Sequence, residues 1–234
     1  MLMTHHPFLN PQCRDDFLHA YRLRRDILQT IKDTLPHMSG RLLDVGCGEM
    51  PYQELVLPHI DEYVGLDLED YPLYQEIEPD ATWDGATMPF ESASFDCALC
   101  TEVLEHCEDP DHVLKEVHRV LKPGGFFVLT VPFLWPLHEV PHDENRPTPF
   151  RLERQLRSAG FTEIRLKAHG GWDASLAQML GLWVQFRSMG AKKRRWMQRL
   201  LAPIVRLLNR IDQKPQTFEN HVMMTGLSGT ARKK

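Results

Sequence analysis

The sequence predicts an α/β protein with a mostly parallel sheet covered by helices on both sides. Strand-like and helix-like segments alternate from residue 15 to about residue 168, the order that builds parallel sheets. A glycine-rich turn with Gly46 and Gly48 directly follows the first predicted strand. The run Phe126 to Val131 is continuously apolar, as in strands that are buried on both faces. In such sheets, ligands bind beyond the carboxyl ends of the strands.

The first elements place the glycine turn between a strand and a helix. A helix is predicted over residues 15–35, because its apolar side chains fall near one face. A buried strand over 41–45 runs into the turn, a helix follows around 51–58, and a short apolar strand covers 63–66. A helix that begins beyond a glycine turn points its free N–H groups at a bound ligand.

The later elements continue the alternation. We predict a strand over 95–100, a helix over 110–121, a strand over 126–131, a helix over 149–159 and a strand over 161–167. Asp109 suits the cap of the first of these helices and Pro110 its first turn. The run Lys122 to Gly125 ends that helix, and Gly160 ends the next one.

Composition favours one domain in a reducing compartment. The chain has 234 residues, of which 42% are hydrophobic and 25% charged, and a net charge of −5. This size predicts a single domain over 1–234, and the charge disfavours a general nucleic-acid binder. The five cysteines have no framework spacing, so free thiols and a cytoplasmic location are expected. No apolar run reaches membrane-spanning length, and residues 1–10 lack a signal-peptide core.

Four landmarks in the chain occur together in a known family. They are the run LLDVGCGEMPY from Leu42, the run Gly65 to Leu68, the run Asp84 to Phe90 followed by SFDCALCTEVLEHCEDP, and the run Val120 to Gly125. In this order the chain resembles the class I S-adenosylmethionine-dependent methyltransferases of the small-molecule branch. The resemblance covers about 38–168, the predicted cofactor-binding core. It implies a doubly wound, Rossmann-like, seven-stranded sheet whose last strand, expected at 221–230, is antiparallel.

The resemblance also implies a set of cofactor-binding residues. Gly46 and Gly48 turn the chain beneath the methionine part, and Asp44 accepts hydrogen bonds from the turn or from the cofactor's ammonium group. An acid at the end of the second strand, here Asp67, takes the ribose hydroxyls, and Asp84 accepts from the adenine amino group. The predicted cofactor-binding residues are Asp44, Gly46, Cys47, Gly48, Asp67, Leu68, Asp84, Gly85, Ala86, Thr101 and Glu102.

The acceptor is expected near the segment 131–150, which leaves the end of the fifth strand. This segment is rich in proline and aromatic residues, and it resembles a proline–histidine–aspartate run of bacterial methyltransferases that accompany sugar and glycan biosynthesis. A hydroxyl of a sugar or glycan intermediate is therefore the preferred acceptor, with a quinone or other lipid-like molecule second and a tRNA base third. Histidine is suited to removing the hydroxyl proton, and His142 and then His106 are the predicted catalytic residues.

Several alternatives stay open. A metal site built from His138, His142 and Asp143 is not expected, because Pro136 and Pro141 prevent a regular helix there. The same segment could be a rigid lid whose polar residues only cap and pair. A nicotinamide dehydrogenase would share the glycine turn, but Pro51 stands where its third glycine would be. A non-catalytic protein that binds S-adenosylmethionine as a partner of another enzyme would keep the same landmarks.

A basic insert, expected over 171–218, separates the sixth strand from the last one. No acid occurs from Ala174 to Ile211, whereas that run contains eight basic residues. A helix would place its arginines, Arg195, Arg199, Arg206 and Arg210, on one face and its large apolar residues on the other, and Pro203 should kink it or start a new helix. Two helices packed on the domain with a solvated basic face are one interpretation. Peripheral binding of 190–211 to an anionic membrane is another, and nucleic-acid binding is disfavoured.

Overall fold

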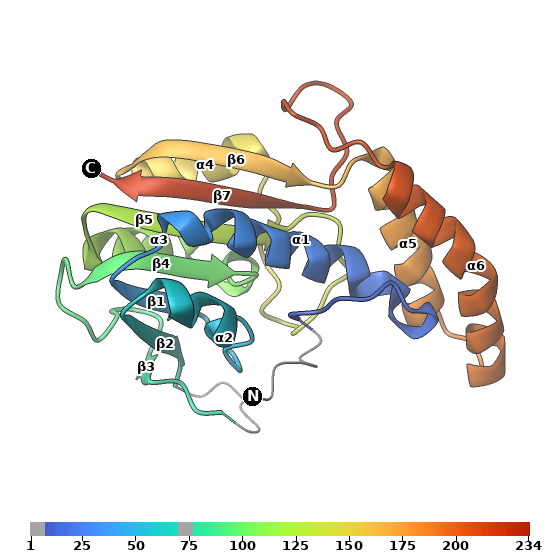
Figure 1. Cartoon of the computed structure of the whole chain (residues 1–234), viewed down its shortest axis with the longest axis horizontal. Coiled ribbons are helices and arrows are strands. Elements are labelled where there is room, and N and C mark those ends of the chain that lie inside the picture. The colour runs from blue at the N-terminus through green and yellow to red at the C-terminus, as the bar shows by residue number, and fades with distance from the viewer. Residues whose placement is uncertain (1–7, 70–76) are drawn as a thin grey trace. The chain divides into compact units, whose positions relative to one another are not determined.

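The computed structural model describes residues 8–69 and 77–234 and contains one seven-stranded sheet (Figure 1). The strands are β1 (Arg41–Val45), β2 (Glu62–Leu68), β3 (Ala81–Trp83), β4 (Phe95–Thr101), β5 (Leu121–Pro132), β6 (Phe161–His169) and β7 (Gly226–Lys233). Their order across the sheet is β3-β2-β1-β4-β5-β7-β6. The sheet is mostly parallel with an antiparallel last strand, which confirms the predicted doubly wound Rossmann-like fold.

The helices occupy the places between the strands. The α-helices are α1 (Leu18–Thr34), α2 (Gln53–Val56), α3 (Pro110–Val120), α4 (Pro149–Ser158), α5 (Trp172–Phe186) and α6 (Ala191–Ile211). Short 3-10 helices are η1 (Asp15–Phe17), η2 (Leu35–His37), η3 (Leu57–His59) and η4 (Leu104–His106). Asp109 accepts a hydrogen bond from the backbone N–H of His112 and caps α3, as predicted.

Strand β1 lies at the centre of the part of the sheet that holds the glycine turn. It pairs in parallel with β2 on one side and with β4 on the other, and Asp44 is level with both Gly65 and Leu99. The side chains of Leu42 and Leu43 are fully buried. Because parallel strands end at the same edge, the segments that follow β1, β2 and β4 come together there.

The chain divides into two compact units. One consists of the residues up to Gln29, with 132–136 and Lys167–Leu227, and the other of Thr30–Val131, Leu137–Leu166 and Ser228–Lys234. The sheet and the predicted cofactor residues belong mainly to the second unit, which we call the sheet unit. Helices α5 and α6 belong to the first, which we call the helical unit. That the whole chain acts as one domain, with the N-terminal helix, core and insert at the predicted bounds, stays a prediction.

Element bounds differ from expectation at two strands. The last strand is Gly226–Lys233, displaced towards the C-terminus from the predicted 221–230. Strand β5 begins at Leu121 and includes the run Lys122–Gly125, of which Pro123 and Gly124 are exposed and which was expected only to end the preceding helix. Leu121 is level with Phe95 of β4, so pairing with a neighbouring strand extends β5 beyond its apolar part. The predictions for residues 1–7 lie outside the described residues.

Helix α6 runs unbroken through Pro203, and no new helix starts there. Its buried residues are Ala202, Val205 and Asn209, not the row of larger apolar residues expected to face the protein. Ala202 and Val205 pack with Leu18 and Ala177 in a small cluster. Of the α6 leucines, Leu208 packs against this cluster while partly buried, and the smaller Ala202 and Val205 lie at its centre. Within the described ranges, none of the helices combines the length and apolar character needed to cross a bilayer.

Candidate active site

The glycine turn after β1 has the conformation that its residues predict. Gly46 has φ +67° and Gly48 has φ +51°, backbone conformations that disfavour other residues. A side chain at Gly46 would collide with Val103, whereas a Cβ at Gly48 would meet no atom within 4 Å. The buried Cys47 lies between them. The open side of the turn at Gly48 is therefore the side on which a cofactor can approach the backbone.

Asp67, at the end of β2, is the acid that holds this turn. Its Oδ2 accepts a hydrogen bond of 2.8 Å from the backbone N–H of Gly48, and its Oδ1 one of 2.8 Å from that of Leu68. The Asp67 side chain is nearly buried, whereas that of Leu68 is exposed. The carboxylate is thus fixed beside the open face of the glycine turn, where the predicted ribose contact requires it.

Asp44 has a different environment from the one predicted. The N–H groups of Gly46 and Cys47 donate to the carbonyl of Leu66, so Asp44 does not accept from the turn. Instead it accepts a hydrogen bond from the Tyr63 hydroxyl, and its other oxygen has no hydrogen-bond partner among the described residues. Burial raises the pKa of Asp44 to about 7, and the Tyr63 hydrogen bond partly opposes this shift. The expectation that turn N–H groups bind Asp44 was wrong, and an ammonium contact stays a prediction.

Asp84 follows the short strand β3, which the sequence marked poorly. It is exposed, and its Oδ1 accepts hydrogen bonds from the backbone N–H groups of Ala86, at 2.9 Å, and Thr87, at 3.3 Å. These hydrogen bonds lower the pKa of Asp84. Gly85, between Asp84 and Ala86, has φ +83°. The carboxylate therefore shapes its own turn, and the predicted contact with adenine stays a prediction.

Two acids follow β4, the partly buried Glu102 and the buried Glu105, and neither has a lysine or arginine at bonding distance among the described residues. Thr101 ends the strand, and Glu102 has φ +55°, a strained conformation for a residue with a side chain. Burial raises the pKa of Glu102 to about 7. The Glu105 side chain is fully buried, and neither of its oxygens has a hydrogen-bond partner among the described residues. Burial, and then the charge of Glu102, raise the pKa of Glu105 well above its ordinary range.

His106 lies beside Glu105 with a defined proton position. Its Nδ1 is 2.9 Å from the backbone carbonyl of His142. A carbonyl can only accept, so Nδ1 carries the hydrogen and Nε2 of the neutral ring is a base. Burial lowers the pKa of His106 and keeps the ring neutral. Nε2 is 3.8 Å from carboxylate oxygens of both Glu105 and Glu139.

The segment after β5 supplies a second histidine, but not the predicted one. The ring of His138 lies 4.6 Å from that of His106, centroid to centroid, whereas the His142 side chain is exposed and contributes only its backbone carbonyl. Asp143 orders this segment: it accepts from the backbone N–H of His138 at 3.1 Å, lies 3.1 Å from the Nδ1 of that ring, and pairs with Arg146 at 2.7 Å. Although burial raises it, these partners lower the pKa of Asp143 overall.

Sequence reasoning therefore missed Glu105, His138 and Arg146 as members of this cluster. Glu105 was inside the quoted run after β4, but nothing local indicated that its side chain is buried. His138 was considered only as a metal ligand. Among the described residues, the ligand atoms of Glu105, His106 and His138 lie within 4.8 Å of one another, a geometry suited to a divalent cation. The set considered from the sequence is not assembled, because the His142 ring is exposed.

Comparisons with known proteins show which proteins this chain is similar to. Residues 43–129 match the family model described as a methyltransferase domain. The chain is 32% identical over 105 residues to the ubiquinone biosynthesis O-methyltransferase of Paraburkholderia phymatum, covering 40% of this chain and 45% of that protein. It is 27% identical over 164 residues to the malonyl-[acyl-carrier protein] O-methyltransferase of Alcanivorax borkumensis, covering 61% of this chain and 55% of that protein. The chain thus spans about half the length of these curated relatives.

The fold is also similar to that of solved methyltransferase structures. The crystal structure of an S-adenosylmethionine-dependent methyltransferase from Archaeoglobus fulgidus superposes with a TM-score of 0.57 at 18% identity, covering 93% of this chain and 99% of that one. The matched residues 43–129 contain the glycine turn, Asp67 and the two acids after β4. Residues 43–129 therefore match a methyltransferase domain, and the fold of the chain is that of S-adenosylmethionine-dependent methyltransferases.

Proposed function

We propose that this protein transfers a methyl group from S-adenosylmethionine to a hydroxyl oxygen of a small molecule. The observation that carries the proposal is His106, a neutral, half-buried histidine whose Nδ1 is held by a carbonyl and whose Nε2 is left as a base. It follows directly after β4, in the segment that borders the sulfonium in related enzymes.

The reaction asks the chain for alignment and for removal of one proton. The cofactor, when bound, supplies a methyl group that is already activated by the sulfonium, so the S–CH₃ bond breaks as the O–CH₃ bond forms. Gly46, Gly48 and Asp67 hold the donor in place. His106 Nε2 accepts the hydroxyl proton, and the Glu139 carboxylate, 3.8 Å away, stabilises the imidazolium that results. Exclusion of water and an in-line geometry supply the remaining acceleration.

The acceptor that we propose is a hydroxyl of a sugar or of a glycan-biosynthesis intermediate. Support comes from the resemblance of the His142-Asp143 segment to methyltransferases of glycan biosynthesis. A quinone-type or other lipid-like hydroxyl compound is the alternative, favoured by the relatives named for ubiquinone biosynthesis. A tRNA base ranks third. We place the reaction in the cytoplasm, where free thiols such as those of the five cysteines persist.

A divalent cation is a second candidate for activating the hydroxyl. The fully buried Glu105 carboxylate, with no hydrogen-bond partner among the described residues, favours it, because His106 and His138 bring nitrogen ligands to the same point. A cation held there would lower the pKa of a bound hydroxyl. Loss of turnover on chelation, restored by zinc or manganese, would assign proton removal to the cation instead of to His106 alone.

Two measurements test the proposed function in order. Isothermal titration should detect binding of S-adenosylhomocysteine and none of NAD; the reverse result would favour the dehydrogenase alternative. Incubation with methyl-labelled S-adenosylmethionine and separate pools of nucleotide sugars, lipid-linked sugars and catechol-type quinone precursors should then label one pool, as read by mass spectrometry. Cofactor binding without labelling of any hydroxyl acceptor would favour a non-catalytic partner protein.

A further inference from the structure

Helix α5 exposes only large apolar side chains. Its five exposed residues are Trp172, Leu176, Met179, Trp183 and Phe186, each between 39% and 65% exposed. They recur at steps of three or four residues, so they form one stripe along the helix. The surface stripe of a helix in contact only with water is normally polar. The exposed face of α5 is therefore suited to an apolar environment.

Helix α6 packs against α5 in the helical unit (Figure 1), and it also exposes a row of large apolar side chains. Its buried residues are small or polar, whereas Trp196, Leu200, Ile204, Leu207 and Ile211 are between 46% and 59% exposed. These five also recur at steps of three or four residues. Two neighbouring helices thus each present an apolar stripe, which is much more than the single scattered apolar residues usual on protein surfaces.

Positive charge accompanies both stripes. From Ala174 to Ile211 the chain has no acid, and its eight basic residues are Arg187, Lys192, Lys193, Arg194, Arg195, Arg199, Arg206 and Arg210. Arg206 pairs with Asp15, and Arg194 donates to the carbonyl of Val184. Lys192, Lys193, Arg195, Arg199 and Arg210 make no ion pair within the described ranges, and all five are exposed. The guanidinium of Arg187 lies over the Trp183 ring at 5.0 Å, so this cation lies on the same surface as the apolar stripe of α5.

We propose that α5 and α6 dock on the surface of an anionic lipid bilayer. Apolar stripes, interfacial tryptophans and unpaired lysines and arginines together are the pattern of interfacial helices, in which apolar side chains enter the acyl boundary and cations stay at the headgroups. A protein partner would need an acidic and apolar counter-surface of matching shape, whereas an anionic bilayer offers both features at any point. The helices lie on the bilayer and do not cross it.

Vesicle sedimentation of the full chain tests the proposal directly. Vesicles of phosphatidylcholine and phosphatidylglycerol in equal parts should carry the protein down, and vesicles of phosphatidylcholine alone should carry down much less. Raised salt should weaken the binding, because headgroup attraction is screened. Equal sedimentation with both vesicles, or none with the anionic ones at low salt, would overturn the proposal.

Two variants separate charge from apolar contact. Replacing Lys192, Lys193, Arg195, Arg199 and Arg210 by Gln should lower the partition coefficient by more than about tenfold, because each cation near an anionic surface contributes a factor of about five. This set spares Arg206 and Arg194, whose contacts hold the unit together. A control that replaces Lys32, Lys115, Arg154, Arg165 and Lys167 by Gln removes the same charge elsewhere and should bind as the parent does. Equal losses in both variants would reduce the effect to net charge.

Replacing Leu176, Met179, Leu200 and Leu207 by Gln tests the apolar stripes and keeps every tryptophan. Three of the five tryptophans, Trp172, Trp183 and Trp196, lie on the stripes. In the parent, lipids brominated on their acyl chains should quench this fluorescence, and in the apolar variant they should quench it much less. A lipid-free dimer that this variant converts to a monomer, with no quenching in the parent, would assign the surface to a second copy. S-adenosylhomocysteine affinity, measured in parallel, reports separately on the proposed function.

Discussion

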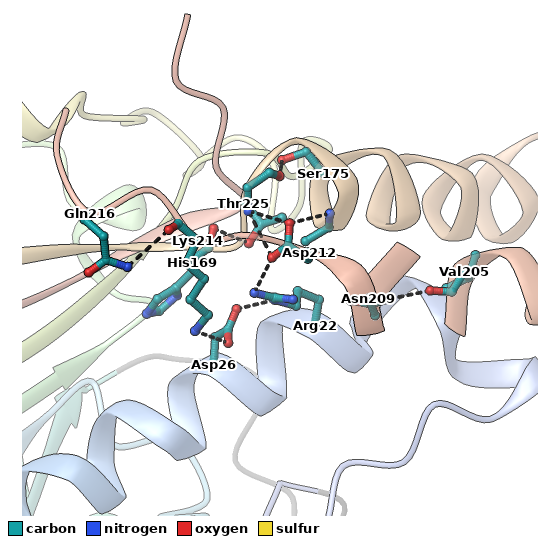
Figure 2. A network of polar contacts seen from close by, with 12 residues as sticks. Arg22, Asp26, His169, Ser175, Val205, Asn209, Asp212, Lys214, Gln216 and Thr225 are labelled. Atoms are coloured by element: carbon teal, nitrogen blue, oxygen red, sulfur yellow. Dashed lines mark hydrogen bonds and ion pairs between the residues drawn. The ribbon is translucent and has the colours of Figure 1, made fainter. Parts of the chain in front are cut away.

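Buried acids occur in both units of this protein, but their surroundings are opposite. In the helical unit, Arg22 lies between two carboxylates, 2.5 Å from Asp26 and 3.0 Å from Asp212, and Lys214 completes the pairing of Asp26 at 2.9 Å (Figure 2). Asp212 also accepts from the backbone N–H groups of Gly171 and Ala174 at the start of α5. In the sheet unit, Asp44 and Glu105 are buried with no cation at bonding distance among the described residues.

The electrostatics follow this difference. Burial raises the pKa of Asp26, but Arg22, His169 and Lys214 outweigh it, and the net shift is downward. For Asp44 and Glu105 burial dominates, and the pKa values rise. Buried acids that are paired with cations stabilise the folded chain. Buried acids without a cationic partner, here at the edge where the parallel strands end, destabilise it. An arrangement of this second kind is typical of a site where a ligand supplies the missing interactions.

The largest expected effect is at Arg22. Arg22→Met should destabilise the protein by about 3–5 kcal/mol, because it leaves Asp26 and Asp212 buried without their shared cation. Denaturant unfolding measures the change. Arg14→Met, which breaks the exposed pair with Asp16, is the matched control and should cost less than about 1 kcal/mol. If both variants lowered the free energy of unfolding equally, the buried network would contribute no more stability than an exposed ion pair.

At the sheet unit, His106→Ala should reduce turnover by about a hundredfold or more, the usual contribution of a general base. S-adenosylhomocysteine affinity should stay at the parent value. Since burial lowers the pKa of His106 below its ordinary 6.5, parent activity should persist as pH falls to that value and decline only below it. His142→Ala is the control, because its exposed ring should be dispensable. A large loss in His142→Ala with an active His106→Ala would restore the assignment made from the sequence.

Asp67→Ala should weaken S-adenosylhomocysteine binding by about 1.5–3 kcal/mol, the range for hydrogen bonds to a charged group. Isothermal titration measures this. Asp80→Ala is the matched control, since Asp80 also accepts a backbone N–H, that of Gly65, but is not a predicted cofactor residue. Parallel thermal unfolding separates cofactor contacts from loss of the Gly48 hydrogen bond. Unchanged affinity in Asp67→Ala would refute the predicted ribose contact.

The smallest expected effect is the change in unfolding free energy when a buried acid is replaced by its amide, and its sign differs between the two units. Glu105→Gln should stabilise the protein at neutral pH by about 0.5–2 kcal/mol, because it removes an acid whose folded pKa is raised. Asp26→Asn should destabilise it, because the folded pKa of Asp26 is lowered and its ionised form stabilises the fold. Both differences should shrink as acid protonates the parent carboxyls in the folded and unfolded states. Denaturant unfolding at neutral and at acid pH measures both changes. If the two substitutions changed stability in the same direction at neutral pH, the proposed difference between the two units would be wrong.

Local sequence determined strand β1, the glycine turn, the cap of α3 and the apolar part of β5. The strand that ends at Val45, the turn at Gly46 and Gly48 and the cap at Asp109 depend on residues adjacent in the chain, whose backbone preferences are intrinsic. The apolar run within β5 likewise indicated a strand buried on both faces. For this reason the mostly parallel α/β sheet and the position of the glycine turn could be predicted, whereas the doubly wound order and the role of Asp67 were implied by the resemblance to a known family.

Only the tertiary structure decided which side chains share an environment. The segment after β5 has no regular period, so its contacts, and not its pattern, place the His138 ring beside His106 and leave the His142 ring exposed. Burial of Glu105 depends on neighbours far along the chain. In α6 the hydrophobic pattern pointed to the large apolar residues, but packing buries Ala202 and Val205 fully and Leu208 only in part, and it leaves Leu200 and Leu207 exposed. Periodicity identifies an apolar face, whereas shape and distant partners determine whether that face is covered.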